Sequence, residues 1–473
     1  MPPPVSQINA GHLERIRAWY DGKPDRLNWA SLGYREILAH YYNLLIPSEA
    51  SVLEVGCGSG GLLGRLKARR RVGVDLSERQ IAAAREGCPD CEFHVQSGEA
   101  LDLAERFDCI VISDTLNFSA DVQQLLERLH SVSHPATRLI VNYPSALWRP
   151  VFAAATAFGI KRGAPPSNWL TSADVVGLME LGDWAPLVVQ PRILWPARAL
   201  GIGSFVNRWL SPLFSWFCLT VFCVARSARG RETGPLTVSV VIPARNEAGN
   251  IEAAVRRTPD MGAGTELIFV EGNSRDNTWE EIERVTRENP GRRIKTLRQP
   301  GKGKGDAVRA GFAAAEGDLF IILDADLTVP PEEMPKFYNA IVSGRAEFAN
   351  GSRLVYPMEK AAMQFLNICA NKAFGILFTW ILGQPLKDTL CGTKVLRRAD
   401  YERIAANRAY FGNFDPFGDF DLLFGAARLN LKIVDVPVRY RDRTYGSTNI
   451  NRWQHGWLLL RMVVFAARKL KFV

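Results

Sequence analysis

Two carboxylates separated by one residue, Asp324 and Asp326, end the apolar run 319–323. The run is apolar throughout and is bounded by Gly317 and Pro330, which is typical of a buried strand in a parallel sheet. Alternate side chains of a strand share a face, so both aspartates are expected at the carboxyl end of a sheet, where ligands bind. A hard divalent cation with phosphate oxygens relieves the repulsion between two such carboxylates. The pattern predicts a metal–phosphate site, and a solvated Asp-x-Asp loop is the alternative.

A glycine-rich turn follows the strand predicted for residues 51–55, and a helix is predicted to follow the turn, at 62–68. Its members are Glu54, Gly56, Gly58 and Gly60. Glycines permit a tight turn and close approach of the backbone to a ligand. Asp75 ends the next predicted strand, about twenty residues further on, where an acidic side chain can hold both hydroxyls of a ribose. The arrangement predicts a nucleoside-binding domain.

This part resembles the class I S-adenosylmethionine-dependent methyltransferases, whose first motif is an acidic residue, one further residue and then Gly-x-Gly-x-Gly. The resemblance implies that Glu54 and the three glycines line the S-adenosylmethionine site and that Asp75 binds the ribose. It also implies that Glu99 lies by the adenine and that Ser113 and Asp114 lie at the mouth of the site. A nicotinamide-binding domain is the alternative, but its fingerprint is Gly-x-Gly-x-x-Gly. The methyl acceptor cannot be inferred from these residues.

A second set of polar residues occupies strand ends and helix starts in the second half. In chain order these are Pro243, Arg245, Glu247, Glu271, Ser274, Lys304, Arg353, Asp388, Asp421 and Arg443. Lys304 lies in a Gly-Lys-Gly-Lys-Gly segment that opens a predicted helix, and such amides and lysines favour phosphate. The segment is not a P-loop, because no Ser or Thr follows the lysine. Asp421 is either a base for a hydroxyl acceptor or a carboxylate favoured by a helix start.

With Asp324 and Asp326, this half resembles family 2 glycosyltransferases of the GT-A fold, and most of all dolichyl-phosphate mannose synthases and bacterial polyprenyl-phosphate glycosyltransferases. The resemblance implies a nucleotide-sugar site that includes Pro243, Arg245, Glu247, Glu271, Ser274, Lys304, Asp324 and Arg443. It implies that Asp324 and Asp326 hold Mg²⁺ or Mn²⁺ and the diphosphate, and that Arg443 belongs to a loop over the diphosphate. Arg353 would face the phosphate of the acceptor, and Asp388 matches an aspartate that the family has later in its sequence.

The chain has 473 residues, of which 47% are apolar and 23% charged, with a net charge of +9. We expect an α/β protein of two doubly wound domains. These are a Rossmann-like methyltransferase domain at 1–230 and a GT-A domain at 235–450, followed by a basic amphipathic tail at 451–473. Several of the eight cysteines lie in apolar runs, which predicts reduced thiols and a cytoplasmic protein.

Two stretches, 128–173 and 184–231, contain no acidic residue, and basic residues are interspersed with aromatic ones in both. This composition favours an anionic membrane surface, and its apolar content is too high for a simple nucleic-acid track. The run 209–225 approaches spanning length, but Pro212 and the strand-like run 219–224 argue against a span. The apolar stretch Met363–Leu382 is expected to be an amphipathic helix on the membrane surface. The sequence therefore predicts a peripheral protein on the cytosolic face and no nucleic-acid partner.

We therefore expect a bifunctional enzyme. One domain would transfer methyl groups from S-adenosylmethionine, and the other would transfer a sugar from a nucleotide sugar to a polyprenyl phosphate, with inversion and with a metal ion. One alternative is a glycosyltransferase that builds surface polysaccharide on a sugar hydroxyl. In another, the first domain only binds S-adenosylmethionine and regulates the second.

Overall fold

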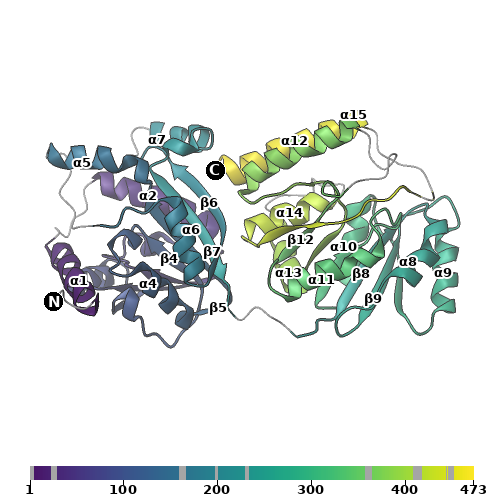
Figure 1. Cartoon of the computed structure of the whole chain (residues 1–473), viewed down its shortest axis with the longest axis horizontal. Helices are drawn as coiled ribbons and strands as arrows, with labels where there is room; N and C mark the ends of the chain where they lie inside the picture. The colour runs from purple at the N-terminus through teal and green to yellow at the C-terminus, as the bar shows by residue number, and fades with distance from the viewer. Residues whose placement is uncertain are drawn as a thin grey trace. The chain divides into compact units, whose positions relative to one another are not determined.

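The computed structural model describes residues 5–22, 29–158, 167–197, 201–229, 234–356, 365–408, 418–443, 445 and 452–473. The chain divides into two compact units, the first ending at Gly230 and the second running from Arg231 to Lys471. Each unit is built on one seven-stranded sheet with helices on its faces (Figure 1). The predicted α/β class with two sheets is confirmed.

The sheet of the first unit has the strand order β3-β2-β1-β4-β5-β7-β6. Its strands are β1 (Ser51–Val55), β2 (Arg70–Asp75), β3 (Glu92–Val95), β4 (Phe107–Ser113), β5 (Ser133–Pro144), β6 (Trp184–Ile193) and β7 (Thr220–Ser227). The first five are parallel, and β7 runs antiparallel between β5 and β6. The order reverses between β1 and β4, and ligands bind at such a switch point in open sheets.

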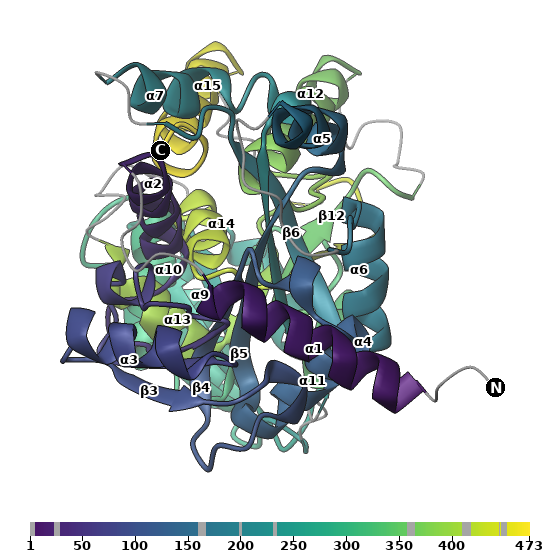
Figure 2. The same cartoon turned by 90° about the vertical axis from the view of Figure 1, so that its left-hand side faces the viewer.

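Helices cover this sheet, and several begin at residues whose side chains satisfy the free amides of the first turn. They are α1 (Val5–Asp21), α2 (Trp29–Leu45), α3 (Glu78–Gly87), α4 (Val122–Arg128), α5 (Arg149–Ala157), α6 (Ser172–Leu181) and α7 (Ile202–Phe205). Short turns are η1 (Leu63–Arg65), η2 (Gly98–Ala100), η3 (Leu116–Phe118), η4 (Leu129–Val132), η5 (Ala146–Trp148), η6 (Val206–Leu210) and η7 (Ser215–Phe217). Helices α4 and α6 lie side by side on one face (Figure 2).

Two expectations for this unit are corrected. The helix predicted for 62–68 is only the 3₁₀ turn η1, because Leu66 is already extended and β2 begins at Arg70. Cys88 and Cys91 form a disulfide, so the prediction of reduced cysteines is wrong for this pair. The strand-like run at 219–224 is confirmed as β7, whose residues are all buried.

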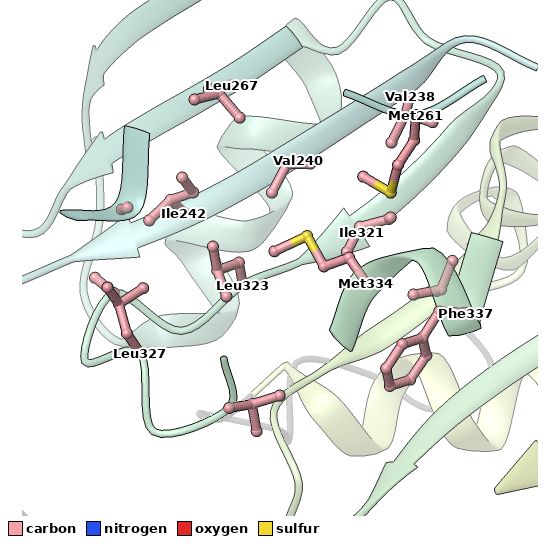
Figure 3. Close-up of a cluster of buried hydrophobic side chains, with 14 of the residues drawn as sticks. Val238, Val240, Ile242, Met261, Leu267, Ile321, Leu323, Leu327, Met334 and Phe337 are labelled. Atoms are coloured by element: carbon pink, nitrogen blue, oxygen red, sulfur yellow. The ribbon is translucent and has the colours of Figure 1, made fainter. Parts of the chain in front are cut away.

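The sheet of the second unit has the order β10-β9-β8-β11-β13-β12-β14. Its strands are β8 (Val238–Ala244), β9 (Thr265–Glu271), β10 (Arg293–Arg298), β11 (Leu319–Ile322), β12 (Phe348–Ser352), β13 (Lys394–Arg397) and β14 (Ile433–Pro437). Only β13 runs antiparallel to its neighbours. Side chains of β8, β9 and β11 pack against Met334 and Phe337 of the neighbouring helix in one buried core (Figure 3).

The helices of this unit are α8 (Ile251–Arg257), α9 (Thr278–Glu288), α10 (Lys304–Ala314), α11 (Met334–Val342), α12 (Phe365–Leu382), α13 (Arg398–Ala406), α14 (Asp419–Arg428) and α15 (Arg452–Ala466). Shorter turns are η8 (Ala248–Asn250), η9 (Pro331–Glu333) and η11 (Ala467–Lys471). Helix α12 packs against α15 and η11 (Figure 1). Met363, the start of the predicted amphipathic stretch, lies outside the described residues. Within the described ranges, no helix combines the length and the apolar character that crossing a bilayer requires.

Trp184 is the largest fully buried side chain of the first unit. Its Nε1 donates to the carbonyl of Leu126 at 2.8 Å, and its ring stacks on His130. We expect Trp184→Ala to lower the free energy of unfolding by about 3–5 kcal/mol, because it leaves a large cavity. Trp184→Phe should cost less. Urea unfolding followed by circular dichroism measures both, and a loss for Trp184→Ala no larger than that for Trp184→Phe would contradict this assignment.

Candidate functional site

The glycine turn after β1 depends on backbone conformations that favour glycine. Gly56, Gly58 and Gly60 have φ angles of 76°, 51° and 71°. A Cβ on Gly60 would meet the ring of Phe93, and one on Gly56 would meet Thr115. The amide of Gly58 donates to Oδ2 of Asp75 at 2.8 Å. The structure thus brings the predicted turn and the predicted ribose-binding acid together.

The carboxylate of Asp75 is oriented by backbone amides at the end of β2. Besides Gly58, the amide of Ser77 donates to its other oxygen, Oδ1, at 2.9 Å. Ser77 in turn caps α3, since its Oγ accepts from the amide of Gln80 at 3.1 Å. A carboxylate held by two amides is preorganised to accept hydroxyl donors.

Glu99 has protein partners of its own. Its Oε1 accepts from Oγ of Ser119 at 2.8 Å and from the amide of Ala120 at 3.0 Å, and its Oε2 accepts from Ser97 at 2.5 Å. These bonds join η2 to the loop after η3. Glu99 therefore fixes a loop at this end of the sheet, and its predicted position beside an adenine stays a prediction.

Glu54 is a buried carboxylate whose environment the sequence did not indicate. It is 2% exposed, and its Oε2 has no hydrogen-bond partner among the described residues. Burial raises the pKa of Glu54 to about 8, although the cation of Arg35 opposes the shift. A buried polar atom without a partner fits a site that receives a donor group from a ligand.

Helices α1 and α2 add tyrosines that the sequence reasoning missed. Burial raises the pKa of Tyr20, Tyr34 and Tyr42 well above the usual value, and the negative charge of Asp114 adds to each shift. Tyr42 donates to Oδ1 of Asn142 at 2.7 Å. The sequence offered one signal for these tyrosines, namely the aromatic residues of α2, the helix that precedes the glycine turn.

Asp114 follows β4, Asn142 lies near the end of the neighbouring parallel strand β5, and the two are hydrogen-bonded to each other. Nδ2 of Asn142 donates to Oδ1 of Asp114 at 2.7 Å, and Asp114 has a φ angle of 51°, which is uncommon for a residue other than glycine. Ser113 lies just before this bend. Oγ1 of Thr115 donates to the carbonyl of Ser113 at 2.9 Å. The predicted mouth residues are thus held by α2, β4 and β5 together.

In the second unit, strand β11 ends earlier than the sequence indicated. It stops at Ile322, so Asp324 and Asp326 lie in the turn that follows and not on the strand. Leu327, immediately after Asp326, has a φ angle of 52°, and the chain turns at this point. Strand alternation therefore does not orient the two carboxylates, and each has a different set of partners.

Asp324 forms an ion pair with Lys304, the first residue of α10, at 2.6 Å. Burial opposes the ionisation of Asp324, but the cations of Lys304, Arg353 and Lys394 outweigh it and hold the pKa of Asp324 below its usual value. A Cβ on Gly392 would collide with this pair, so a larger residue there would force the pair to shift. The predicted phosphate-side lysine and the predicted metal-binding aspartate are thus in direct contact.

Asp326 faces Arg443, whose Nη2 lies 2.5 Å from Oδ2. The same guanidinium contacts Glu247 at 3.2 Å, while the other oxygen of Asp326 accepts from Thr328. Burial raises the pKa of Glu247 to about 7, and Asn250 and Arg443 oppose that shift. Arg443 therefore joins the turn after β8 to the turn after β11.

The turns after β8 and β9 are tied to each other. The amide of Asn246 donates to Oγ of Ser274 at 3.0 Å, and the amide of Arg275 donates to Oδ1 of Asn246 at 2.8 Å. Glu271 is buried and accepts from the amide of Ser274 at 2.5 Å. Pro243 is the last residue but one of strand β8, and Arg245 is exposed just beyond the strand. These predicted nucleotide-site residues share the carboxyl edge of β8 and β9.

Arg353 and Asp388 form a buried bidentate ion pair. Nε and Nη2 of Arg353 donate to the two carboxylate oxygens at 2.8 and 2.9 Å, and Asn371 of α12 donates to Oδ1 at 2.7 Å. Burial opposes ionisation, but the pair raises the pKa of Arg353 and lowers that of Asp388. Removing one partner of such a pair typically costs 3–5 kcal/mol, so Arg353 has a structural role besides any contact with an acceptor.

Two further charged residues of this unit, Lys394 and Asp421, have partners within the protein. Lys394 is fully buried, and its Nζ donates to Oδ1 of Asn350 at 2.6 Å; the sequence gave no indication of its burial. Asp421, on the first turn of α14, accepts from Nε of Arg408 at 2.7 Å. The carboxylate predicted as a base is therefore already paired with a cation.

A metal site was predicted at Asp324 and Asp326. No cluster of three His, Cys, Asp or Glu side chains suited to a metal occurs in the described part of the chain. The donor chemistry nevertheless fits a hard cation such as Mg²⁺ or Mn²⁺, because both groups are carboxylates and each already compensates a positive charge, from Lys304 or Arg443. Phosphate oxygens would have to complete the coordination.

Comparisons with known proteins give one family match in each unit. Residues 52–136 match the family model described as a methyltransferase domain, and residues 239–404 match that described as glycosyl transferase family 2. The two matches confirm both resemblances noted in the sequence.

Two curated relatives match the second half. A dolichol-phosphate mannosyltransferase of Pyrococcus furiosus is 30% identical over 223 residues, 46% of this chain and 59% of the relative. An undecaprenyl-phosphate 4-deoxy-4-formamido-L-arabinose transferase of Pseudomonas aeruginosa is 29% identical over 222 residues, 45% and 59% respectively. The chain thus spans 59% of the length of each. A methyltransferase structure from Thermotoga maritima covers 46% of this chain and 98% of its own, at 19% identity and a TM-score of 0.34.

The environment of Glu54 makes stability depend on pH. In the unfolded chain its carboxyl ionises near 4.5, whereas burial raises its pKa to about 8 in the folded state. Between these values the folded state holds more protons, so the free energy of unfolding should fall as the pH rises. Glu54→Gln cannot ionise. Its stability relative to the natural protein should therefore increase from about pH 5 to about pH 8 in urea unfolding. A difference that does not change with pH would contradict the assignment.

Proposed function

We propose that this chain, which joins a methyltransferase domain to a family 2 glycosyltransferase domain, catalyses two transfers. The first unit transfers a methyl group from S-adenosylmethionine. The second transfers a sugar, with inversion, from a nucleotide sugar to a polyprenyl phosphate. The observation that carries the first activity is the bond from the glycine turn to Asp75. The second rests on the cluster of Glu247, Asp326 and Arg443 beside the Lys304–Asp324 pair.

In the first unit, Asp75 binds the ribose hydroxyls and the glycine turn admits the donor close to the backbone. The free oxygen of Glu54 accepts a hydrogen bond from a polar group of the donor. Tyr34, Asp114 and Asn142 lie on the acceptor side, where the hydroxyl and the carboxylate orient an incoming nucleophile. The alternative is that this unit only binds S-adenosylmethionine and regulates the other.

In the second unit, Asp324 and Asp326 would hold Mg²⁺ or Mn²⁺, which supplies charge stabilisation for the departing diphosphate. Lys304 and Arg443 bring two positive charges to the same carboxylates, and they bind the diphosphate from either side. A phosphate acceptor is already ionised at neutral pH and attacks the anomeric carbon without a strong base. This agrees with Asp421 being engaged by Arg408. A sugar-hydroxyl acceptor, which needs a base, is the alternative.

A polyprenyl phosphate must be reached at the surface of a membrane, and α12 and α15 suit that surface. Ile376 and Trp457 are 72% and 63% exposed, and Lys372 and Arg461 are exposed on the same two helices. Asn371 connects α12 to the buried pair of Arg353 and Asp388. We propose peripheral attachment through these helices, with the acceptor phosphate held near Arg353.

Asp75→Ala should weaken the binding of S-adenosylmethionine by about 1–3 kcal/mol, because charge-assisted hydrogen bonds to the ribose are lost. Sugar transfer should continue. Isothermal titration calorimetry measures the donor affinity, and circular dichroism checks that the variant is folded. An unchanged affinity in a folded variant would show that Asp75 does not hold the donor.

Asp326→Asn should abolish most sugar transfer and its dependence on added Mg²⁺ or Mn²⁺, since it removes a proposed metal ligand. Labelled nucleotide sugars incubated with polyprenyl phosphate provide the assay, and the binding of S-adenosylmethionine serves as an internal control that should not change. Asp318→Asn is a matched variant, because Asp318 precedes the same strand but bonds to Thr237. Full activity of the natural protein in EDTA would rule out the metal mechanism.

A further inference from the structure

The first unit exposes large apolar side chains on two segments that its active site does not use. One segment is η5 with the start of α5, where Leu147 and Val151 are more than half exposed. The other is Leu213–Phe217, where Leu213 and Trp216 are 62% and 72% exposed. Exposed apolar side chains that gather in this way mark a surface for a partner or a membrane.

The two segments are adjacent. Nε1 of Trp148 donates to the carbonyl of Phe217 at 3.0 Å, and the amide of Ser145 donates to the carbonyl of Leu219 at 2.8 Å. We call the exposed residues Leu147, Val151, Leu213, Phe214, Trp216 and Phe217 the apolar rim. Helix α7, which carries further exposed apolar residues, lies at the same end of this unit as α5 (Figures 1 and 2).

Charge identifies the occupant of the apolar rim. No acidic residue occurs in 128–173 or in 184–231, the two stretches that contain the rim. Arg149 and Arg208 are exposed in these stretches. Aromatic and aliphatic side chains beside arginines, without acids, suit the interface of an anionic bilayer.

Both segments of the rim are anchored in the site of the first unit. Strand β5, which carries Asn142, ends at Pro144, and only Ser145 separates it from η5. Asn142 is hydrogen-bonded to Asp114. The other segment leads into Thr220, whose Oγ1 is hydrogen-bonded to the hydroxyl of Tyr34 at 2.9 Å. The charge of Asp114 contributes to the raised pKa of Tyr34, so these groups are close together. The rim therefore starts at the acceptor side of the site.

We infer that the apolar rim inserts into an anionic bilayer and that the methyl acceptor is an amphiphile of that bilayer, which reaches the site beside Asp114 and Tyr34. In the transfer, an oxygen or nitrogen of its headgroup bonds to the methyl carbon as the carbon–sulfur bond breaks. The electron pair stays on sulfur, S-adenosylhomocysteine leaves, and the proton of the acceptor passes to solvent. The choice of acceptor rests on the proposed methyl transfer, whereas the membrane contact rests on the rim alone.

The full chain carrying Leu213→Glu and Trp216→Glu tests the membrane contact. The matched control is Leu181→Glu, which changes a residue that is 64% exposed on α6, outside the rim. Co-sedimentation uses vesicles of phosphatidylcholine with phosphatidylglycerol. All proteins carry Ile376→Glu and Trp457→Glu, so that α12 and α15 contribute little. The rim variant should bind about tenfold less than the control, because two apolar side chains no longer insert.

Equal vesicle binding by the rim variant and the control would overturn the inference. So would a change of oligomeric state in light scattering without a change in vesicle binding, because the rim would then join two copies of the chain. Circular dichroism and the affinity for S-adenosylmethionine, which should match the control, verify that the rim variant is folded.

A second arm tests the class of acceptor with methyl-labelled S-adenosylmethionine and vesicles made from a total membrane lipid extract. Label should enter the organic phase with the control and fall at least several-fold with the rim variant. Label that enters only water-soluble material would overturn the assignment of an amphiphilic acceptor. A natural protein that does not bind S-adenosylmethionine would refute the proposed methyl transfer, and the vesicle result would still decide the membrane contact.

Discussion

Partly buried carboxylates at the ends of parallel strands need donors or cations beside them, and this constraint shapes both sites. In the first unit, backbone amides of Gly58 and Ser77 compensate Asp75. In the second, side-chain cations do so, with Lys304 at Asp324 and Arg443 at Asp326. An amide cannot leave its carboxylate without a change of fold, whereas a side-chain cation can turn toward a phosphate. The backbone therefore fixes the carboxylate of the first site, whereas the cations of the second can turn on their side chains.

The buried pair of Arg353 and Asp388 connects the sheet of the second unit to its surface. Asp388 accepts hydrogen bonds from Arg353, which follows β12, and from Asn371 on α12. One carboxylate therefore attaches a helix with exposed apolar residues to a charged site. The charge of Arg353 also reaches Asp324, whose pKa it helps to lower. Asp324, Arg353 and Asp388 thus share one electrostatic environment.

Much of both sites followed from local patterns. The spacing of Gly56, Gly58 and Gly60 reflects backbone angles that only glycine adopts easily, and such angles are a property of a few successive residues. The acid at the end of the next strand, Asp75, is likewise set by the short strand–turn–strand path. Polar residues that follow apolar runs, such as Glu247 and Asp324, could be predicted as site residues for the same reason.

Tertiary structure decided which of these groups meet. Arg443 lies 196 residues from Glu247, and no local pattern could pair them with Asp326. The tyrosines of α1 and α2 resembled ordinary amphipathic helix residues until packing placed Tyr42 against Asn142, 100 residues away. The early end of β11 could not be predicted either, because Leu323 and Ala325 are as apolar as the strand itself. The chain leaves the sheet in the turn that contains Leu327. Residue types and short spacings determine local backbone and the kind of chemistry, whereas distances between remote side chains depend on how the sheets and helices pack.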